Sequence, residues 1–146
     1  MLKTFATICI IGMFTSSCTS KKASRTEGSH EAEQDLTMIV GTYTSGDSKG
    51  LYSFRFNEEN GTATALSEAE VENPSYLVPS ADGKFIYAVS EFSNEQAAAN
   101  AFAFNKEEGT FRLLNTQKTG GEDPCYIITN GSNVVTANYS GGSISV

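Results

Sequence analysis

The sequence has 146 residues, of which 39% are hydrophobic and 18% are charged, and its net charge at pH 7 is −7. The part from Leu36 onward carries thirteen acidic and six basic residues, so the acidic excess belongs to this part. Nucleic-acid binding needs clustered Lys and Arg to neutralise phosphates. The composition therefore excludes a nucleic-acid partner.

The chain begins with the pattern of an export signal. Lys3 supplies a positive charge, and residues 5–14 form an apolar run that is shorter than the roughly 20 residues of a membrane-spanning helix. Small residues then precede Cys18 and resemble the lipobox at which bacterial lipoproteins are cleaved and acylated, although Thr15 departs from the usual aliphatic residue. We therefore predict a signal peptide over residues 1–17 and a lipid on Cys18. The alternative is a plain secretory signal with an incidental cysteine.

Residues 18–35 are polar and carry mixed charges, which predicts a flexible linker between the lipidated cysteine and the folded part. The linker contains His30, the only histidine of the sequence. Lys21 and Lys22 follow the cysteine without an acidic run. We expect an exported protein of the bacterial cell envelope, attached to the membrane by its lipid and facing the periplasm.

A repeat with a period of about 48 residues fills residues 36–146, and the order of its segments is the same each time, which makes coincidence a poor explanation. The matching segments are residues 39–43, 87–91 and 135–139; residues 54–62 and 102–110; and, at a shift of 50, residues 73–77 and 123–127.

One repeat predicts four short strands, because β-forming runs alternate with turn residues. The runs cover residues 75–79, 84–90, 100–105 and 110–117. Asp82-Gly83 and Glu108-Gly109 lie between strands, where tight hairpins require φ > 0. Four antiparallel strands in a repeat of 40–50 residues are typical of a propeller blade. The predicted fold class is an all-β propeller with four-stranded antiparallel blades.

Residues 36–146 amount to about 2.3 repeats, whereas a closed ring needs roughly four to eight blades. We therefore expect a partial propeller domain over residues 36–146, truncated at its C-terminal side, with the full protein continuing beyond Val146.

Several segments resemble the seven-bladed propeller lactonase family, which includes bacterial 6-phosphogluconolactonases and is related to fungal muconate lactonising enzymes. They are residues 40–44 (VGTYT), 50–52 (GLY), 73–77 (NPSYL), 80–87 (SADGKFIY), 123–126 (DPCY) and 137–143 (ANYSGGS). The resemblance implies seven blades in the full protein and a small-molecule sugar lactone as the substrate. It also implies hydrolysis of 6-phosphoglucono-δ-lactone to 6-phosphogluconate without a metal or cofactor.

Two departures leave alternatives open. The His, Arg and Glu side chains thought to act in the muconate relatives lie on later blades, so no catalytic residue can be carried over to this sequence. Export is also unusual for an enzyme of a cytoplasmic phosphorylated lactone, which leaves an unphosphorylated lactone as another substrate. A non-catalytic envelope propeller that binds carbohydrate or protein is the alternative function.

Candidate site residues follow from blade geometry. The loop that enters the first strand of a blade and the loop that leaves the second strand meet at the same end, around the central channel where propeller ligands bind. The candidates are Glu91 and Asp123 as bases or ligand acceptors, and Tyr43, Asn73, Asn138 and Tyr139 for substrate binding, with Tyr43, Asn138 and Tyr139 as hydrogen-bond donors. The alternative roles are solvated or capping carboxylates for Glu91 and Asp123, and turn residues before proline for Asn73 and Asp123. Residues 36–146 contain no histidine, no catalytic triad and no zinc-ligand spacing.

Overall fold

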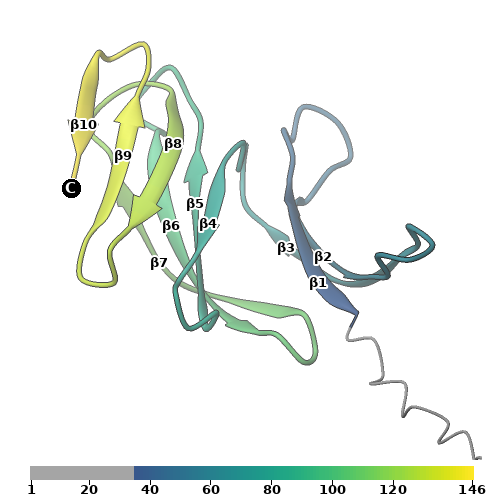
Figure 1. Ribbon diagram of the computed structural model, residues 1–146. Helices are drawn as coiled ribbons and strands as arrows, with labels where there is room; N and C mark the ends of the chain where they lie inside the picture. Colours follow the sequence, from purple (N-terminus) through teal and green to yellow (C-terminus); the bar gives the residue numbers. More distant parts are fainter. Residues whose placement is uncertain (1–34) are drawn as a thin grey trace, which may run out of the picture. The chain divides into compact units, whose positions relative to one another are not determined.

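The computed structural model describes residues 35–146. The expected signal peptide, Cys18 and nearly all of the linker lie outside the described residues. Within residues 35–146 the chain forms ten strands and no helix, as Figure 1 shows. Accordingly, this part contains no helix with the length and apolar character needed to cross a membrane.

The strands form three antiparallel sheets in chain order (Figure 1). The first sheet contains β1 (Leu36–Gly41), β2 (Gly50–Phe56) and β3 (Ala63–Glu70). The second contains β4 (Leu77–Pro79), β5 (Phe85–Ser90), β6 (Ala98–Asn105) and β7 (Thr110–Lys118). The third contains β8 (Pro124–Thr129), β9 (Val134–Asn138) and β10 (Ser143–Ser145).

The sheets reproduce the sequence repeat strand by strand. The segments that match at a shift of 48 lie at the ends of β1, β5 and β9, and the matching proline-led segments lie at the starts of β4 and β8. The second sheet is therefore one complete four-stranded blade, and each of the other two sheets has three strands of a blade. The predicted all-β fold with four-stranded antiparallel blades is confirmed.

Three strands begin elsewhere than predicted, and for β5 the difference is a single residue, since it starts at Phe85 rather than Lys84. β4 starts at Leu77 rather than Ser75, because Ser75 N donates to the nearby carbonyl oxygen of Asn73 over 2.8 Å and not to a neighbouring strand. β6 starts at Ala98 rather than Asn100. Its first two residues are alanines, which carry no strand preference in the sequence, but they pair with the end of β5.

The main core lies between the first and second sheets. Its buried residues are Leu51, Ile86, Ala88, Phe102 and Phe104. Ile86 pairs with Phe102 across β5 and β6, so these two side chains share one face of the second sheet. β3 contacts β7, and β5 contacts β8. Each sheet thus buries apolar residues against its neighbour in the chain, as stacked blades do.

The β6–β7 hairpin also bonds to the first sheet. The hydroxyl groups of Ser53 and Ser67 both donate to the carbonyl oxygen of Gly109 over 2.6 Å, and Arg55 Nη2 donates to the carbonyl oxygen of Glu107 over 2.8 Å. These bonds fix the relative position of the two sheets at the end opposite to the candidate site.

Candidate functional site

The loops expected to meet at one end of the blades do meet there. The backbone N–H of Glu91, which follows β5, donates to the carbonyl oxygen of Asn73, which precedes β4, over 3.0 Å. The next blade repeats this bond, because Tyr139 N donates to Asp123 O over 2.8 Å. We call the surface formed by Tyr43, Asn73, Ser75, Glu91 and Asp123 the rim.

Two turns with left-handed backbone geometry hold the rim. Asn73 and Asp123 have φ values of 47° and 51°, a region in which Asn and Asp are tolerated better than most other residues. Each is followed by a fully buried proline, Pro74 or Pro124. Both residues therefore form the turn before proline that the sequence offered as an alternative. This turn places them beside the loops that follow β5 and β9.

Glu91 accepts two hydrogen bonds on one oxygen. Tyr43 Oη donates to Glu91 Oε2 over 2.9 Å, and Ser75 Oγ donates to the same oxygen. Tyr43 follows β1, whereas Ser75 and Glu91 belong to the second blade, so this carboxylate connects the two sheets. The Tyr43 side chain remains accessible, with 58% of its surface exposed.

Asn73 uses its whole side chain to connect loops. Its Oδ1 accepts from both the backbone N–H and the hydroxyl group of Thr44, each over 3.1 Å. Its Nδ2 donates to the carbonyl oxygen of Glu91 over 3.3 Å. Asn73 therefore joins the loop after β1 to the loop after β5, and within the described residues one of its two Nδ2 protons remains unused.

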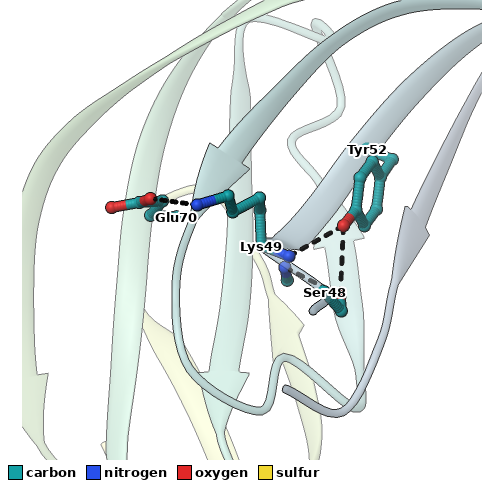
Figure 2. Close-up of polar contacts among 5 residues, drawn as sticks. Ser48, Lys49, Tyr52 and Glu70 are labelled. Atoms are coloured by element: carbon teal, nitrogen blue, oxygen red, sulfur yellow. Dashed lines mark hydrogen bonds and ion pairs between the residues drawn. The ribbon is translucent and has the colours of Figure 1, made fainter. Parts of the chain in front are cut away.

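The loop that carries Tyr43 is anchored at its far end, as Figure 2 shows. Tyr52 Oη accepts from the backbone N–H of Lys49 over 2.7 Å and lies 3.2 Å from Ser48 Oγ. Lys49 Nζ pairs with Glu70 Oε1 over 2.9 Å. Glu70 raises the pKa of Lys49, and Lys49 lowers the pKa of Glu70. Because this ion pair is exposed, solvent screens it, and the bonds to Tyr52 matter more for holding the loop.

Asp123 differs from its counterpart Asn73 in the previous blade. Its backbone N–H donates to the carbonyl oxygen of Phe92 over 2.8 Å. In the repeat, Phe92 stands where Thr44 stands one blade earlier, and phenylalanine has no hydroxyl group to donate. Among residues 35–146, the hydrogen bonds of Asp123 involve only its backbone, which leaves both carboxylate oxygens free to accept.

Asn138 and Tyr139 have different positions from the rim residues. Asn138 is 2% exposed, and its Nδ2 donates to the hydroxyl oxygens of Ser143 and Ser145 over 3.1 and 2.9 Å. Its amide protons are thus committed inside the third sheet. Tyr139 is 81% exposed, beside Asp123. The structure brings Tyr43, Asn73, Glu91 and Asp123 together and places Asn138 in the interior.

Ser75 and Thr44 were given no role from the sequence, yet each bonds directly to a candidate residue. Ser75 donates to Glu91, and Thr44 donates to Asn73. The repeat carried a signal for both residues, because their counterparts at shifts of 50 and 48 are Cys125 and Phe92. At both repeated positions a hydroxyl residue in one blade is replaced by a residue without a hydroxyl group in the next. Such a change indicates a hydrogen bond that only one of the two blades can form.

We expect the Glu91→Gln substitution to lower the pKa of Tyr43. The pKa of Tyr43 lies above its ordinary 10.0, and the largest cause is the hydrogen bond to Glu91. Desolvation and the negative charge of Glu91 follow in size, and the charge of Asp123 acts in the same direction. The folded state thus favours the neutral phenol. Its contribution to stability is present below the unfolded pKa of Tyr43 and is lost as the pH rises through the folded value.

The measurement is a ¹³C NMR titration of the tyrosine Cζ resonances, with the Tyr43 signal assigned from a Tyr43→Phe variant. A Tyr43 pKa that stays the same in Glu91→Gln would show that the hydrogen bond does not form in solution.

Grooves lie between the sheets, apart from the rim. One of about 560 Å³ is lined by residues of the second and third sheets, among them Tyr87, Asn115 and Thr136. Another of about 350 Å³ lies between β3 and the second sheet, next to Glu72 and Lys118. Within residues 35–146, no group of three His, Cys, Asp or Glu side chains is arranged to hold a metal ion.

Comparison with known proteins identifies the family. The family model described as a seven-bladed β-propeller lactonase matches residues 37–146. The 6-phosphogluconolactonase of Bacillus subtilis is 35% identical over 113 residues, which cover 73% of this chain and 31% of that protein.

Solved structures agree with this match. One from Bacteroides fragilis, which carries the provisional name 6-phosphogluconolactonase, is 70% identical with a TM-score of 0.76, over 78% of this chain and 32% of that one. The periplasmic gluconolactonase of Pseudomonas aeruginosa is 25% identical with a TM-score of 0.63, over 69% of this chain and 30% of that one. The chain thus spans about a third of the length of these relatives, and it belongs to the lactonase family of seven-bladed β-propellers.

Proposed function

We propose that the full-length propeller, meaning this chain continued to the length of its relatives, hydrolyses a sugar δ-lactone. The leading substrate is 6-phosphoglucono-δ-lactone, with 6-phosphogluconate as the product. The observation that carries the proposal is the match of residues 37–146 to the lactonase family, supported by relatives named 6-phosphogluconolactonase in Bacillus subtilis and Formosa agariphila.

The reaction sets clear requirements for the site. The oxygen of a water molecule bonds to the lactone carbonyl carbon, and the bond between that carbon and the ring oxygen breaks. A base takes the proton of the water, and the released ring oxygen gains a proton, so that lactone and water yield one hydroxy acid. Hydrogen-bond donors must also stabilise the negative oxygen of the intermediate. Glu91 and Asp123 are carboxylates of the rim that can accept hydrogen bonds from a substrate, and we expect donors for the oxyanion from the remaining blades.

An unphosphorylated lactone is the alternative substrate. The predicted export signal of residues 1–17 supports it, and so does the likeness to a periplasmic gluconolactonase of Pseudomonas aeruginosa. The described rim residues carry two carboxylates and no Lys or Arg, so a phosphate group would have to be bound by other parts of the ring.

Hydrolysis of a panel of lactones by the full-length propeller tests the proposal. Proton release from 6-phosphoglucono-δ-lactone and from glucono-δ-lactone is measured at constant pH with a chelator present, and each rate is compared with a protein-free control because δ-lactones open spontaneously. We expect a rate well above the control for at least one of them, and the ratio of kcat/KM values identifies the substrate. Rates equal to the control for both lactones would reject the enzyme and favour a scaffold that binds carbohydrate or protein.

We also expect Cys18 to be lipidated, which would anchor the protein in the cell envelope. One acyl chain binds membranes weakly and several hold firmly. Labelled fatty acid fed to a bacterial host that expresses the protein should enter the wild type and not Cys18→Ala, while Cys125→Ala serves as the matched cysteine control. Equal labelling of wild type and Cys18→Ala would contradict the expected lipid anchor.

A further inference from the structure

The rim offers more acceptors than donors. A phenol has one proton, and Tyr43 gives it to Glu91, so the Tyr43 oxygen can only accept from a ligand. Ser75 likewise gives its hydroxyl proton to Glu91. Asp123 has two free carboxylate oxygens among the described residues, and an ionised carboxylate only accepts.

The Asn73 amide adds one donor, because only one of its two Nδ2 protons is used within the described residues. Its Oδ1 bonds to Thr44 and its Nδ2 bonds to the carbonyl oxygen of Glu91. The equivalent turn one blade later carries Asp123 instead, with Phe92 in place of Thr44. The position that connects two loops in one blade is thus a free carboxylate in the next.

A surface of acceptors suits a ligand that presents donors. The ring of an aldonolactone carries several hydroxyl groups, each with one proton to give, whereas its carbonyl and ring oxygens only accept. Such a surface repels phosphate and has too few donors to stabilise an oxyanion well. It therefore suits the hydroxyl side of a sugar ring and not the carbonyl that is attacked.

We propose that Tyr43, Glu91 and Asp123 form a subsite that accepts hydrogen bonds from the hydroxyl groups of the sugar ring. Asp123 and the Tyr43 oxygen contact the hydroxyl groups, and Glu91 is a positioning residue that holds the Tyr43 proton. This inference rests on the proposed function for the identity of the ligand. It assigns the rim to substrate recognition and leaves proton transfer in the reaction to other groups.

The test is calorimetric binding of glucono-δ-lactam, a stable amide analogue of the lactone, to the full-length propeller. We expect Asp123→Asn to weaken binding roughly 10- to 100-fold, as for a lost hydrogen bond to a charged group. Asparagine keeps the turn, since Asn73 adopts the same φ region one blade earlier. Tyr43→Phe should weaken binding about 2- to 10-fold. Glu59→Gln, an exposed position in the turn between β2 and β3, is the matched control and should bind like the wild type.

A double-mutant cycle tests the role of Glu91. If Glu91 acts through Tyr43, the loss caused by Glu91→Gln should nearly disappear when Tyr43 is already phenylalanine, whereas the loss from Asp123→Asn should add to either. In turnover, the Asp123→Asn loss should fall on KM rather than on kcat.

The outcomes separate this inference from the proposed function. Lactam binding that depends on Asp123 and Tyr43, without turnover of any lactone, would reject the enzyme and keep the subsite. Wild-type affinity in both Asp123→Asn and Tyr43→Phe would overturn the subsite, and so would absence of lactam binding to the wild type. A fall in kcat with unchanged KM in Asp123→Asn would overturn it too, because Asp123 would then be the base.

Discussion

Replacing Gly50 by alanine is expected to destabilise the full-length propeller by about 3 kcal/mol or more. Gly50 has a φ of 110°, and a Cβ atom there would lie 2.0 Å from the carbonyl oxygen of Val71. The close approach is part of the fold, because Val71 N donates to the carbonyl oxygen of Lys49 over 3.0 Å. An added methyl group would have to push apart the start of β2 and the segment after β3.

Two glycines in the loops that connect the strands of the same sheet are matched controls. Gly61 also has a positive φ, 71°, but a Cβ there would meet no atom within 4 Å, so Gly61→Ala should cost only about 1–2 kcal/mol. Gly46 has an open surrounding and no positive φ, so Gly46→Ala should change the stability by less than about 0.5 kcal/mol. Urea unfolding of the three variants measures the differences. Equal losses for Gly50→Ala and Gly61→Ala would show that the contact with Val71 carries no energy.

The chain of 146 residues by itself is expected to show no lactone turnover above the spontaneous rate and no sharp unfolding transition. The third sheet exposes Ile128 and Ile144, which are 46% and 71% accessible. Blades bury such faces against their neighbours, and open faces with unpaired strand edges favour association. The chain also spans only about a third of the length of its lactonase relatives.

Scanning calorimetry and sedimentation compare this chain with the full-length propeller, which should be a compact monomer or a defined oligomer with one sharp transition. A monodisperse 146-residue monomer with an equally sharp transition would contradict the dependence of these blades on their neighbours.

The repeat made most of the fold predictable. Phe102 and Phe104 recur at the spacing of Phe54 and Phe56, and this spacing placed β2 and β6 at equivalent positions of two blades. The strand ends were less predictable where they depend on backbone hydrogen bonds rather than on side-chain preferences. The start of β4 depends on the local bond from Ser75 N to the carbonyl oxygen of Asn73, and the start of β6 depends on pairing with β5 rather than on its alanines.

The location of the rim could be predicted from blade topology, but the state of its groups could not. In the sequence, Glu91 is a carboxylate that follows a predicted strand, and Asp123 is a carboxylate that precedes a proline. Only the structure shows that Glu91 accepts from Tyr43 and Ser75 while the Asp123 carboxylate is free within the described residues. At a shift of 48 residues, Asn138 is the counterpart of Ser90, the residue before Glu91. Its side chain is buried because it bonds to Ser143 and Ser145 of the adjoining strand.

The most direct measurement is a crystal structure of the full-length propeller with glucono-δ-lactam bound. We expect the lactam at the rim, with hydroxyl groups of its ring within hydrogen-bond distance of the Asp123 carboxylate and the Tyr43 oxygen, and its carbonyl group turned toward the remaining blades. A lactam bound instead in the groove between the second and third sheets, beside Tyr87 and Asn115, would contradict the assignment of the rim as the sugar-binding part of a lactonase.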